Sequence, residues 1–333
     1  MHISLPPPPF FLALDAGGTS TRATILDGSG KCLGYGRSGP GNPISSGFDR
    51  ALTSLLEATQ RALESTGGKA SNWAGMTLAM AGGSTQLPQE KLTKAFELLG
   101  LRGKLMIDSD LLATYYSGTY HSDGYALVAG TGAVCARVRN YRLDRVVDGV
   151  GWLLGDEGSG FWLGHRAVRA VAADLDGRAP RTAITGPLLE RLDIAISKAT
   201  HEGRPAALQS LIQAVYALRP IELASFAVLV FEAARAGDVV AHSLLQRAGA
   251  ALSRSLSTAR IPEVKGPVVL GGSILSAGSV IDDELSGHLG DLHPVRVPDG
   301  LAGAALLALR HADLPVGKEV FERIAQSLGE LRS

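Results

Sequence analysis

The sequence is poor in cysteine. Among 333 residues only Cys32 and Cys135 are present, and they form no CxxC pair. Zinc sites and cysteine-held iron–sulfur clusters need several closely spaced thiols, so neither is expected within this chain. A disulfide framework is not expected either, and a reducing cytosol suits this composition. The eight histidines are scattered without an HExxH motif, which gives no indication of a metal bound by histidine.

The sequence also lacks an excess of charge of either sign. Lys plus Arg and Asp plus Glu both number 32, so the formal net charge is +0. Nucleic acids and anionic membranes attract basic surfaces, and the balance therefore predicts neither as a partner. No stretch approaches the roughly 20 apolar residues of a membrane-spanning helix, and the N-terminus lacks the basic start of a signal peptide. We expect a cytoplasmic protein.

Glycine, in contrast, is abundant. The chain has 41 glycines, and many of them fall in short clusters. Because glycine has no Cβ, such clusters are typical of turns in which the backbone approaches a ligand closely. The length is sufficient for two domains of ordinary size, each with its own core.

The N-terminal region predicts three antiparallel strands. Residues 10–16 are an apolar run that ends in a Gly-Gly turn, residues 21–26 are rich in strand formers, and residues 31–37 follow a second turn. The same order of strand, Gly/Thr turn, strand, turn and strand restarts at residue 125, about 115 residues later. This internal echo predicts a duplicated α/β domain.

Helices and further strands are predicted in the rest of the chain. Leucine spacing predicts a helix over residues 49–64, and the segment from 160 to 260 is mostly helical. We expect an N-terminal lobe of residues 1–115 and a larger C-terminal lobe of residues 116–315 that carries this helical insertion. The last helix, within residues 316–333, is expected to pack back on the first lobe.

Three of the predicted strands end in turns of small residues. These turns are Asp15-Ala16-Gly17-Gly18-Thr19, Gly130-Thr131-Gly132 and Gly271-Gly272-Ser273. A concave turn of backbone N–H groups holds phosphate well, and the hydroxyls of Thr19, Ser20 and Thr131 can add donors. A single turn of this kind is usually a hairpin, but three of them together with Asp15 predict a phosphate site. Neither GxxxxGK[ST] nor GxGxxG after a first strand is present, which disfavours P-loop and Rossmann folds.

This layout resembles the sugar kinase, heat-shock protein 70 and actin superfamily. Within it the chain resembles the N-acetylglucosamine kinase branch, which is related to the BadF/BadG activator ATPases. The resemblance covers nearly the whole chain, and its most specific stretches are LDAGGTSTRATILD, AGTGAV and GVGWLLGDEGSGFWLG. It implies a two-lobed, duplicated ribonuclease H-like fold of the actin/hexokinase type, with ATP and a sugar in the cleft between the lobes.

The resemblance also implies roles for the three turns. Gly17, Gly18 and Thr19 would cradle the β- and γ-phosphates of ATP, with Ser20 beside them. Gly130, Thr131 and Gly132 would hold phosphates from the opposite lobe, and Gly271, Gly272 and Ser273 would lie near the adenosine. Many relatives have Ser after the second turn, where this chain has Ala133. The substitution removes one hydroxyl donor but keeps the backbone N–H.

Two acids are the candidates for the chemistry. Asp15 closes the first strand beside a phosphate turn, so it can hold Mg²⁺ directly or through water, although it could also cap the turn. Asp110 follows a predicted strand over residues 104–107 and resembles the strand-end Asp that serves as the general base. Asp108 is its rival, and Asp108, Ser109 or Asp110 could instead cap the helix that follows.

The sugar site is expected mainly at the GVGWLLGDEGS stretch. A carboxylate accepts two hydrogen bonds from vicinal hydroxyls, so Asp156 is the first choice and Glu157 the second, though either could belong to a capping box. Gly151 and Trp152 are expected to line the same pocket, whereas Trp162 is expected in the core. Asn42 matches a sugar-contacting Asn of the family, and a plain turn is its alternative.

The activity expected from the resemblance is transfer of phosphate from MgATP to the 6-hydroxyl of N-acetylglucosamine or glucosamine. An N-acetylmuramic acid kinase stays open, as does a homodimer. Two alternatives of another class are an activator ATPase of a dehydratase and a non-catalytic sugar sensor. The activator needs cysteines for a shared cluster, and the sensor does not need the acids that are retained here. The cysteine-rich zinc motif of ROK sugar kinases is missing.

Overall fold

The computed structural model contains two five-stranded sheets with the same strand order, and it describes residues 9–68, 72–80, 88–197, 199–275, 280–289 and 292–333. The first sheet has the order β3-β2-β1-β4-β5 and the second the order β8-β7-β6-β11-β12. In each, three antiparallel strands are followed by two parallel ones. The predicted duplication and the predicted α/β fold class are therefore confirmed.

The strand bounds agree closely with the apolar runs of the sequence. The first sheet contains β1 (Phe10–Ala16), β2 (Thr21–Asp27), β3 (Cys32–Ser38), β4 (Trp73–Met80) and β5 (Lys104–Ser109). The second contains β6 (Gly124–Ala129), β7 (Ala133–Arg139), β8 (Arg142–Asp148), β11 (Val268–Gly271) and β12 (Pro294–Arg296). A small hairpin, β9 (Thr200–His201) with β10 (Arg204–Pro205), lies in the helical insertion.

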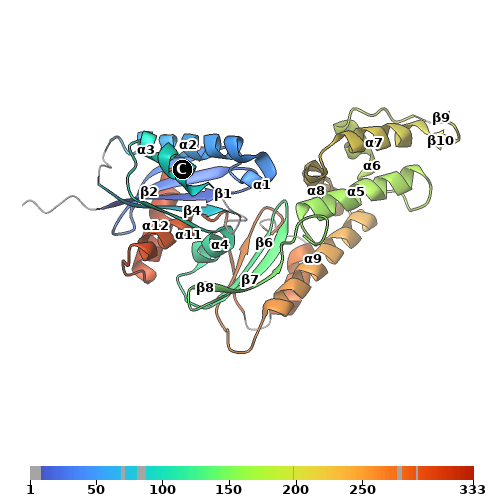
Figure 1. Ribbon diagram of the computed structural model, residues 1–333. Coiled ribbons are helices and arrows are strands. Elements are labelled where there is room, and N and C mark those ends of the chain that lie inside the picture. The colour runs from blue at the N-terminus through green and yellow to red at the C-terminus, as the bar shows by residue number, and fades with distance from the viewer. Residues whose placement is uncertain (1–8, 69–71, 81–87, 198, 276–279, 290–291) are drawn as a thin grey trace, which may run out of the picture.

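The helices cover both sheets, as Figure 1 shows. Those of the first half are α1 (Pro43–Ser46), α2 (Phe48–Ser65), α3 (Gln89–Leu98) and α4 (Asp110–Gly118). The second half has α5 (Gly160–Leu175), α6 (Thr185–Arg191), α7 (Ala206–Ala217), the 3₁₀ helix η1 (Pro220–Phe226), α8 (Ala227–Arg235), α9 (Val239–Ala259) and α10 (Val280–Leu289). The chain ends with α11 (Leu301–His311) and α12 (Lys318–Arg332).

β1 is apolar along its whole length because it is covered on both faces. Phe10, Leu12 and Leu14 pack in one core with α2 and α3, whereas Phe11 and Ala13 pack in another with α4 and α11. α2 lies very close to β3, and a Cβ at Gly36 would come within 2.0 Å of the carbonyl oxygen of Ala58. Glycine is thus required at this position of the strand.

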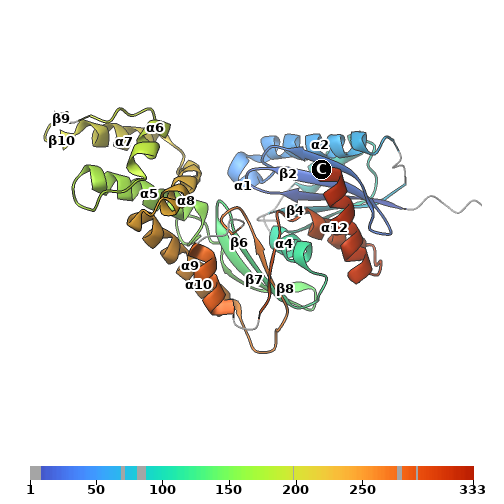
Figure 2. The ribbon, with the colours of Figure 1, turned by 180° about the vertical axis from the view of Figure 1, so that it is seen from behind.

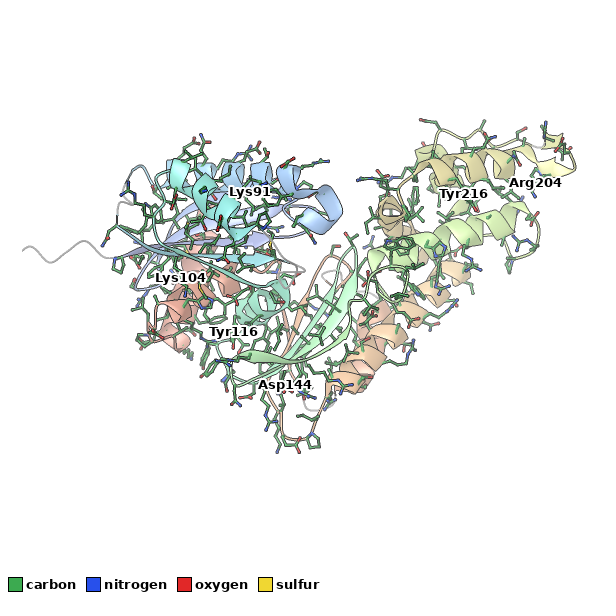
Figure 3. The ribbon with its side chains drawn as sticks, viewed as in Figure 1. Lys91, Lys104, Tyr116, Asp144, Arg204 and Tyr216 are labelled. Atoms are coloured by element: carbon green, nitrogen blue, oxygen red, sulfur yellow. The ribbon has the colours of Figure 1, made fainter. Side chains whose placement is uncertain are left out.

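Helices α4 and α11 lie at the junction of the two sheets. α4 contacts β6 and β11 of the second sheet as well as β4 and β5 of the first. Tyr116 of α4, labelled in Figure 3, therefore lies near the middle of the molecule, whereas Arg204 lies at the far end of the helical insertion and Tyr216 lies inward of Arg204. This junction places the start of α4 close to the ends of the strands of the first sheet.

The C-terminal segment returns to the first sheet. α11 packs against β1, β2 and β4, although the predicted limits assign residues 301–311 to the C-terminal lobe. α12 packs on β3, where the backbone amide of Cys32 donates to the Ser327 hydroxyl, and Figure 2 shows the helix beside the first sheet. The exact limits of the lobes, at residues 115 and 315, stay a prediction.

Candidate active site

The first glycine turn offers two backbone donors. Beyond β1 the amide of Gly17 donates to the carbonyl of Ser20 at 3.0 Å, and this bond closes the turn. Within the described part of the chain, the amides of Gly18 and Thr19 donate to no backbone carbonyl or side chain. The amides of Gly41 and Asn42 donate to the Gly17 carbonyl, so Asn42 lies directly beside this turn. Such unpaired amides fit phosphate oxygens.

Asp15 is buried at the end of β1 beside the segment that precedes α11. Its Oδ2 accepts a hydrogen bond from the amide of Gly300 at 3.0 Å and lies 3.7 Å from Nη1 of Arg22. Burial, together with the neighbouring carboxylate of Asp299, raises the pKa of Asp15 to about 7, although Arg22 opposes the shift. A carboxylate that is costly to ionise without a cation is well suited to hold a divalent metal.

A network of ion pairs surrounds Asp15. Asp299 lies 3.1 Å from Nε of Arg22 and 2.8 Å from Nη2 of Arg332, so one acid joins the first sheet to the C-terminal helix. The side chain of Asp299 is nearly inaccessible, whereas those of Arg22 and Arg332 are partly exposed. Sequence reasoning missed Arg22, Asp299 and Gly300, because 285 positions separate Asp15 from Gly300.

Asp110 is the first residue of α4, and its neighbours have other partners. The hydroxyl of Ser109 accepts from the amide of Leu111 at 3.2 Å, so Ser109 is the N-cap. The rival Asp108 pairs with Nε2 of His311 on α11. Burial raises the pKa of Asp110, while hydrogen bonds from the amide of Leu111 and from its own amide oppose the shift. Asp110 makes a small contribution to the raised pKa of Asp15. Because Asp15 of β1 and Asp108 of β5 are both in register with Ala79 of β4, Asp110 lies at the same edge of the sheet as Asp15.

The second and third glycine turns lie against each other. Gly130 donates to the carbonyl of Gly132 at 2.9 Å, and a Cβ at Gly272, where φ is +90°, would lie 2.9 Å from the amide nitrogen of Gly130. Among the described residues, the amides of Thr131 and Gly132 donate to no backbone carbonyl or side chain. Ser273 continues the third turn. The second turn thus offers two phosphate donors of the same kind as the first.

Asp156 lies beside the second turn. A Cβ at Gly132 would come within 2.9 Å of Oδ2 of Asp156, so glycine makes room for this carboxylate. Burial raises the pKa of Asp156, and hydrogen bonds from the backbone of Ala133 and Gly151 oppose the shift. The backbone amide of Ala133, which the sequence suggested as a donor to phosphate, thus donates to Asp156. The capping alternative does not apply, because Ser159 caps α5 and accepts from the amide of Trp162.

Asp148 holds the loop that carries Asp156, and sequence reasoning missed it. One of its oxygens accepts from the amides of Gly149 and Asp156, at 2.8 Å and 2.7 Å, and the other accepts from the amide of Glu157 at 3.0 Å. Asp148 and Asp156 both have positive φ, 63° and 56°. Aspartate visits this region more readily than most residues. The position of Asp148, the last residue of β8 before the Gly149-Val150-Gly151 turn, could have indicated this role.

The other predicted sugar residues of this stretch belong to the same loop as Asp156. Glu157 pairs with Arg254 of α9 at 3.1 Å. Gly151 is exposed with φ of 85°, and no atom of the described residues lies within 4 Å of its Cβ position. Trp152 is 43% exposed, and its ring lies 5.4 Å from that of Phe161. Trp162 is buried, as expected of a core residue.

The contacts thus form two half-sites. Asp15, Asn42, Asp110 and the first turn belong to one, and Asp156 with the second and third turns belongs to the other. Two pairs of unpaired amides and a buried carboxylate fit a nucleotide with Mg²⁺. No group of three or more metal-binding side chains is found within the described segments, so such a metal would take its other ligands from phosphate and water.

The two cysteines are not placed to bind a cluster. Cys32 and Cys135 are both buried, and burial raises the pKa of the two thiols to about 11 and about 12. Ligation of a shared cluster needs accessible thiolates. No helix of the described segments is both long and apolar enough to cross a membrane.

Comparison with known proteins shows the family of the chain. Residues 12–308 match the BadF/BadG/BcrA/BcrD ATPase family. The chain is 28% identical over 321 residues to N-acetyl-D-glucosamine kinase of Dictyostelium discoideum, with 90% of this chain and 97% of that protein covered. It is 26% identical over 277 residues to N-acetylmuramic acid/N-acetylglucosamine kinase of Clostridium acetobutylicum, with coverages of 82% and 86%.

A solved structure shares the architecture. The crystal structure of a candidate N-acetylglucosamine kinase from Chromobacterium violaceum superposes with a TM-score of 0.70. The two sequences are 25% identical, and the alignment covers 91% of this chain and 100% of that one.

Proposed function

Because the chain belongs to the BadF/BadG/BcrA/BcrD ATPase family, we propose that it is an ATP-dependent kinase that phosphorylates the 6-hydroxyl of an amino sugar, N-acetylglucosamine in the first place. One observation carries the proposal. Asp110 stands at the start of α4, where it is neither the N-cap residue nor part of the ion pair that Asp108 makes. The parallel strands β1, β4 and β5 bring Asp15 and Asp110, the proposed metal-binding carboxylate and the proposed base, to the same edge of the first sheet.

The residues have separate tasks in the transfer. The carboxylate of Asp110 orients the 6-hydroxyl and accepts its proton as the oxygen attacks the γ-phosphorus. The bond between that phosphorus and the β–γ bridging oxygen breaks, and ADP leaves. The amides of Gly18, Thr19, Thr131 and Gly132 hold the phosphates, with the hydroxyls of Thr19, Ser20 and Thr131 as further donors. Mg²⁺ held by Asp15 supplies charge neutralisation when it is bound.

The sugar is bound from the opposite side of the site. Asp156 accepts hydrogen bonds from ring hydroxyls, Trp152 and Gly151 form a wall, and Asn42 approaches from the first turn. Gly271, Gly272 and Ser273 lie near the adenosine. These assignments rest on the proximity of Asp156 to Gly132 and of Asn42 to Gly17.

N-Acetylglucosamine is favoured over glucosamine by the pairing of Glu157. A free 2-ammonium group needs a carboxylate, and the carboxylate of Glu157 lies 3.1 Å from Arg254. An acetamido group needs an apolar surface, which the half-exposed indole of Trp152 supplies.

A coupled assay of ADP release tests the proposal. We expect turnover with N-acetylglucosamine that exceeds turnover with glucosamine, N-acetylmuramic acid or glucose. Asp110→Asn should lower kcat by about 10²-fold or more, whereas the matched variant Asp108→Asn should retain most of it. Similar losses in both variants would refute the assignment of the base, and absence of turnover with every amino sugar would refute the kinase.

A further inference from the structure

A group of arginines on α5 and α9 has few acidic partners. Arg166 and Arg169 of α5 and Arg247 of α9 appear in none of the ion pairs of the described residues, and Arg169 and Arg247 are exposed. The guanidinium carbon of Arg166 lies 4.2 Å from the centre of the Trp162 ring, and that of Arg247 lies 5.7 Å from the same ring. Two guanidinium groups therefore lie against one indole.

The positive charges of Arg166, Arg169 and Arg247 repel one another. Burial and then the charges of Arg247 and Arg169 lower the pKa of Arg166. Burial and then Arg169 and Arg166 likewise lower the pKa of His165, whose ring stacks on Phe161. Glu157 is the carboxylate that acts in the opposite direction on Arg166, but Glu157 is paired with Arg254.

Hydrogen-bond acceptors are also in short supply at this place. Nε of Arg166 and Nε1 of Trp162 are buried donors that find no partner among the described residues. A buried donor without an acceptor is unfavourable, and so is the close approach of like charges. Cation–π contact with the indole offsets part of this cost, but it supplies neither negative charge nor an acceptor for either N–H.

We propose that Arg166, Arg169 and Arg247 form a binding site for the phosphate group of a small molecule, outside the catalytic half-sites. A phosphate dianion has two negative charges and several acceptor oxygens, so it can bind three guanidinium groups at once. A single carboxylate has one negative charge and cannot balance three guanidinium groups. Arg166 follows Gly160, the residue next to the second turn, by six positions, which is about 9 Å along the helix. At this distance along the helix the arginines can hold a second anion while the turns hold the nucleotide.

The site is tested by calorimetric titration with inorganic phosphate and, separately, with glycerol 3-phosphate. The protein is saturated with MgADP so that the phosphate turns are occupied, and sodium chloride keeps the ionic strength constant. We expect saturable binding of one or both probes. The probe with the lower Kd shows whether the site prefers free phosphate or a phosphate ester. Arg169→Gln and Arg247→Gln should each weaken it about tenfold, since each removes a charge-assisted hydrogen bond.

Arg178→Gln is the matched control, because Arg178 follows α5 but is paired with Asp176 and is 65% exposed. It should bind both probes as the wild type does. Equal thermal unfolding of the three variants shows that the fold is retained. The proposal is overturned if neither probe binds, if Arg169→Gln and Arg247→Gln bind like the wild type, or if Arg178→Gln is weakened to the same extent.

Discussion

Asp15→Asn should make the ligand-free protein more stable at neutral pH although it removes a residue assigned to catalysis. Asp15 is buried, next to the carboxylate of Asp299, and its folded-state pKa is raised from 3.8 to about 7. Without a bound cation, ionisation of this carboxyl opposes folding. Asparagine occupies the same volume, carries no charge and can still accept the hydrogen bond from Gly300.

The magnitude follows from the pKa difference. A rise from 3.8 to about 7 is about 3 pKa units, and each unit corresponds to 1.36 kcal/mol, so the cost is about 4 kcal/mol above pH 7. Between about pH 4 and pH 7 the folded state retains a proton that the unfolded state has lost. The free energy of unfolding of the wild type therefore falls as the pH rises through this window, and that of Asp15→Asn lacks this contribution.

Urea denaturation in the presence of EDTA measures the difference between the two proteins. The variant should equal the wild type near pH 4 and exceed it progressively towards pH 8, by up to about 4 kcal/mol. Asp193→Asn is the control, because Asp193 is exposed and asparagine also tolerates its φ of 54°; its effect should stay within about 0.5 kcal/mol. If Asp15→Asn is less stable at neutral pH, or if the difference does not grow with pH, the account of this site is wrong.

The remaining predictions concern catalysis and packing. The kcat/KM of the wild type should fall at acid pH with an apparent pKa above 3.8, because protonated Asp110 cannot accept the hydroxyl proton. A kcat/KM that stays constant down to pH 3.8 would contradict the assignment of Asp110 as the base. Asp156→Asn should raise the sugar KM by about tenfold and change the KM for ATP little, as initial rates would measure. Gly303→Ala should destabilise the protein by more than about 3 kcal/mol, because its Cβ would lie 1.8 Å from the carbonyl oxygen of Ala113; Gly329→Ala, with no atom within 4 Å, should not.

Much of the fold could be predicted from local patterns. The apolar runs at residues 10–16 and 125–129 bury both faces, so their composition marks them as central strands without knowledge of the rest of the chain. The repeated order of strands and glycine turns indicated the duplication, which the matching strand orders confirm. Asp15 and Asp110 could be singled out from the sequence, because Asp15 lies at the end of β1 and Asp110 directly follows β5.

The choice between neighbouring acids could not be made from the sequence. Asp108 and Asp110 follow the same strand, and only the packing of α11 shows that Asp108 is taken by His311, 203 positions away. Glu157 and Asp156 are adjacent, yet the position of α9 directs one to Arg254 and leaves the other beside Gly132. A side chain's partner depends on which helix packs over it, and this is a long-range property.

Sequence alone determined the strands, the glycine turns and the residue types available for phosphate and for proton transfer, because these depend on hydrophobic periodicity and on the missing Cβ of glycine. Tertiary structure decided which carboxylates are free, which are paired and which are costly to ionise. Those properties arise from burial and from charges that lie hundreds of residues apart in the chain, as Asp15 and Asp299 show.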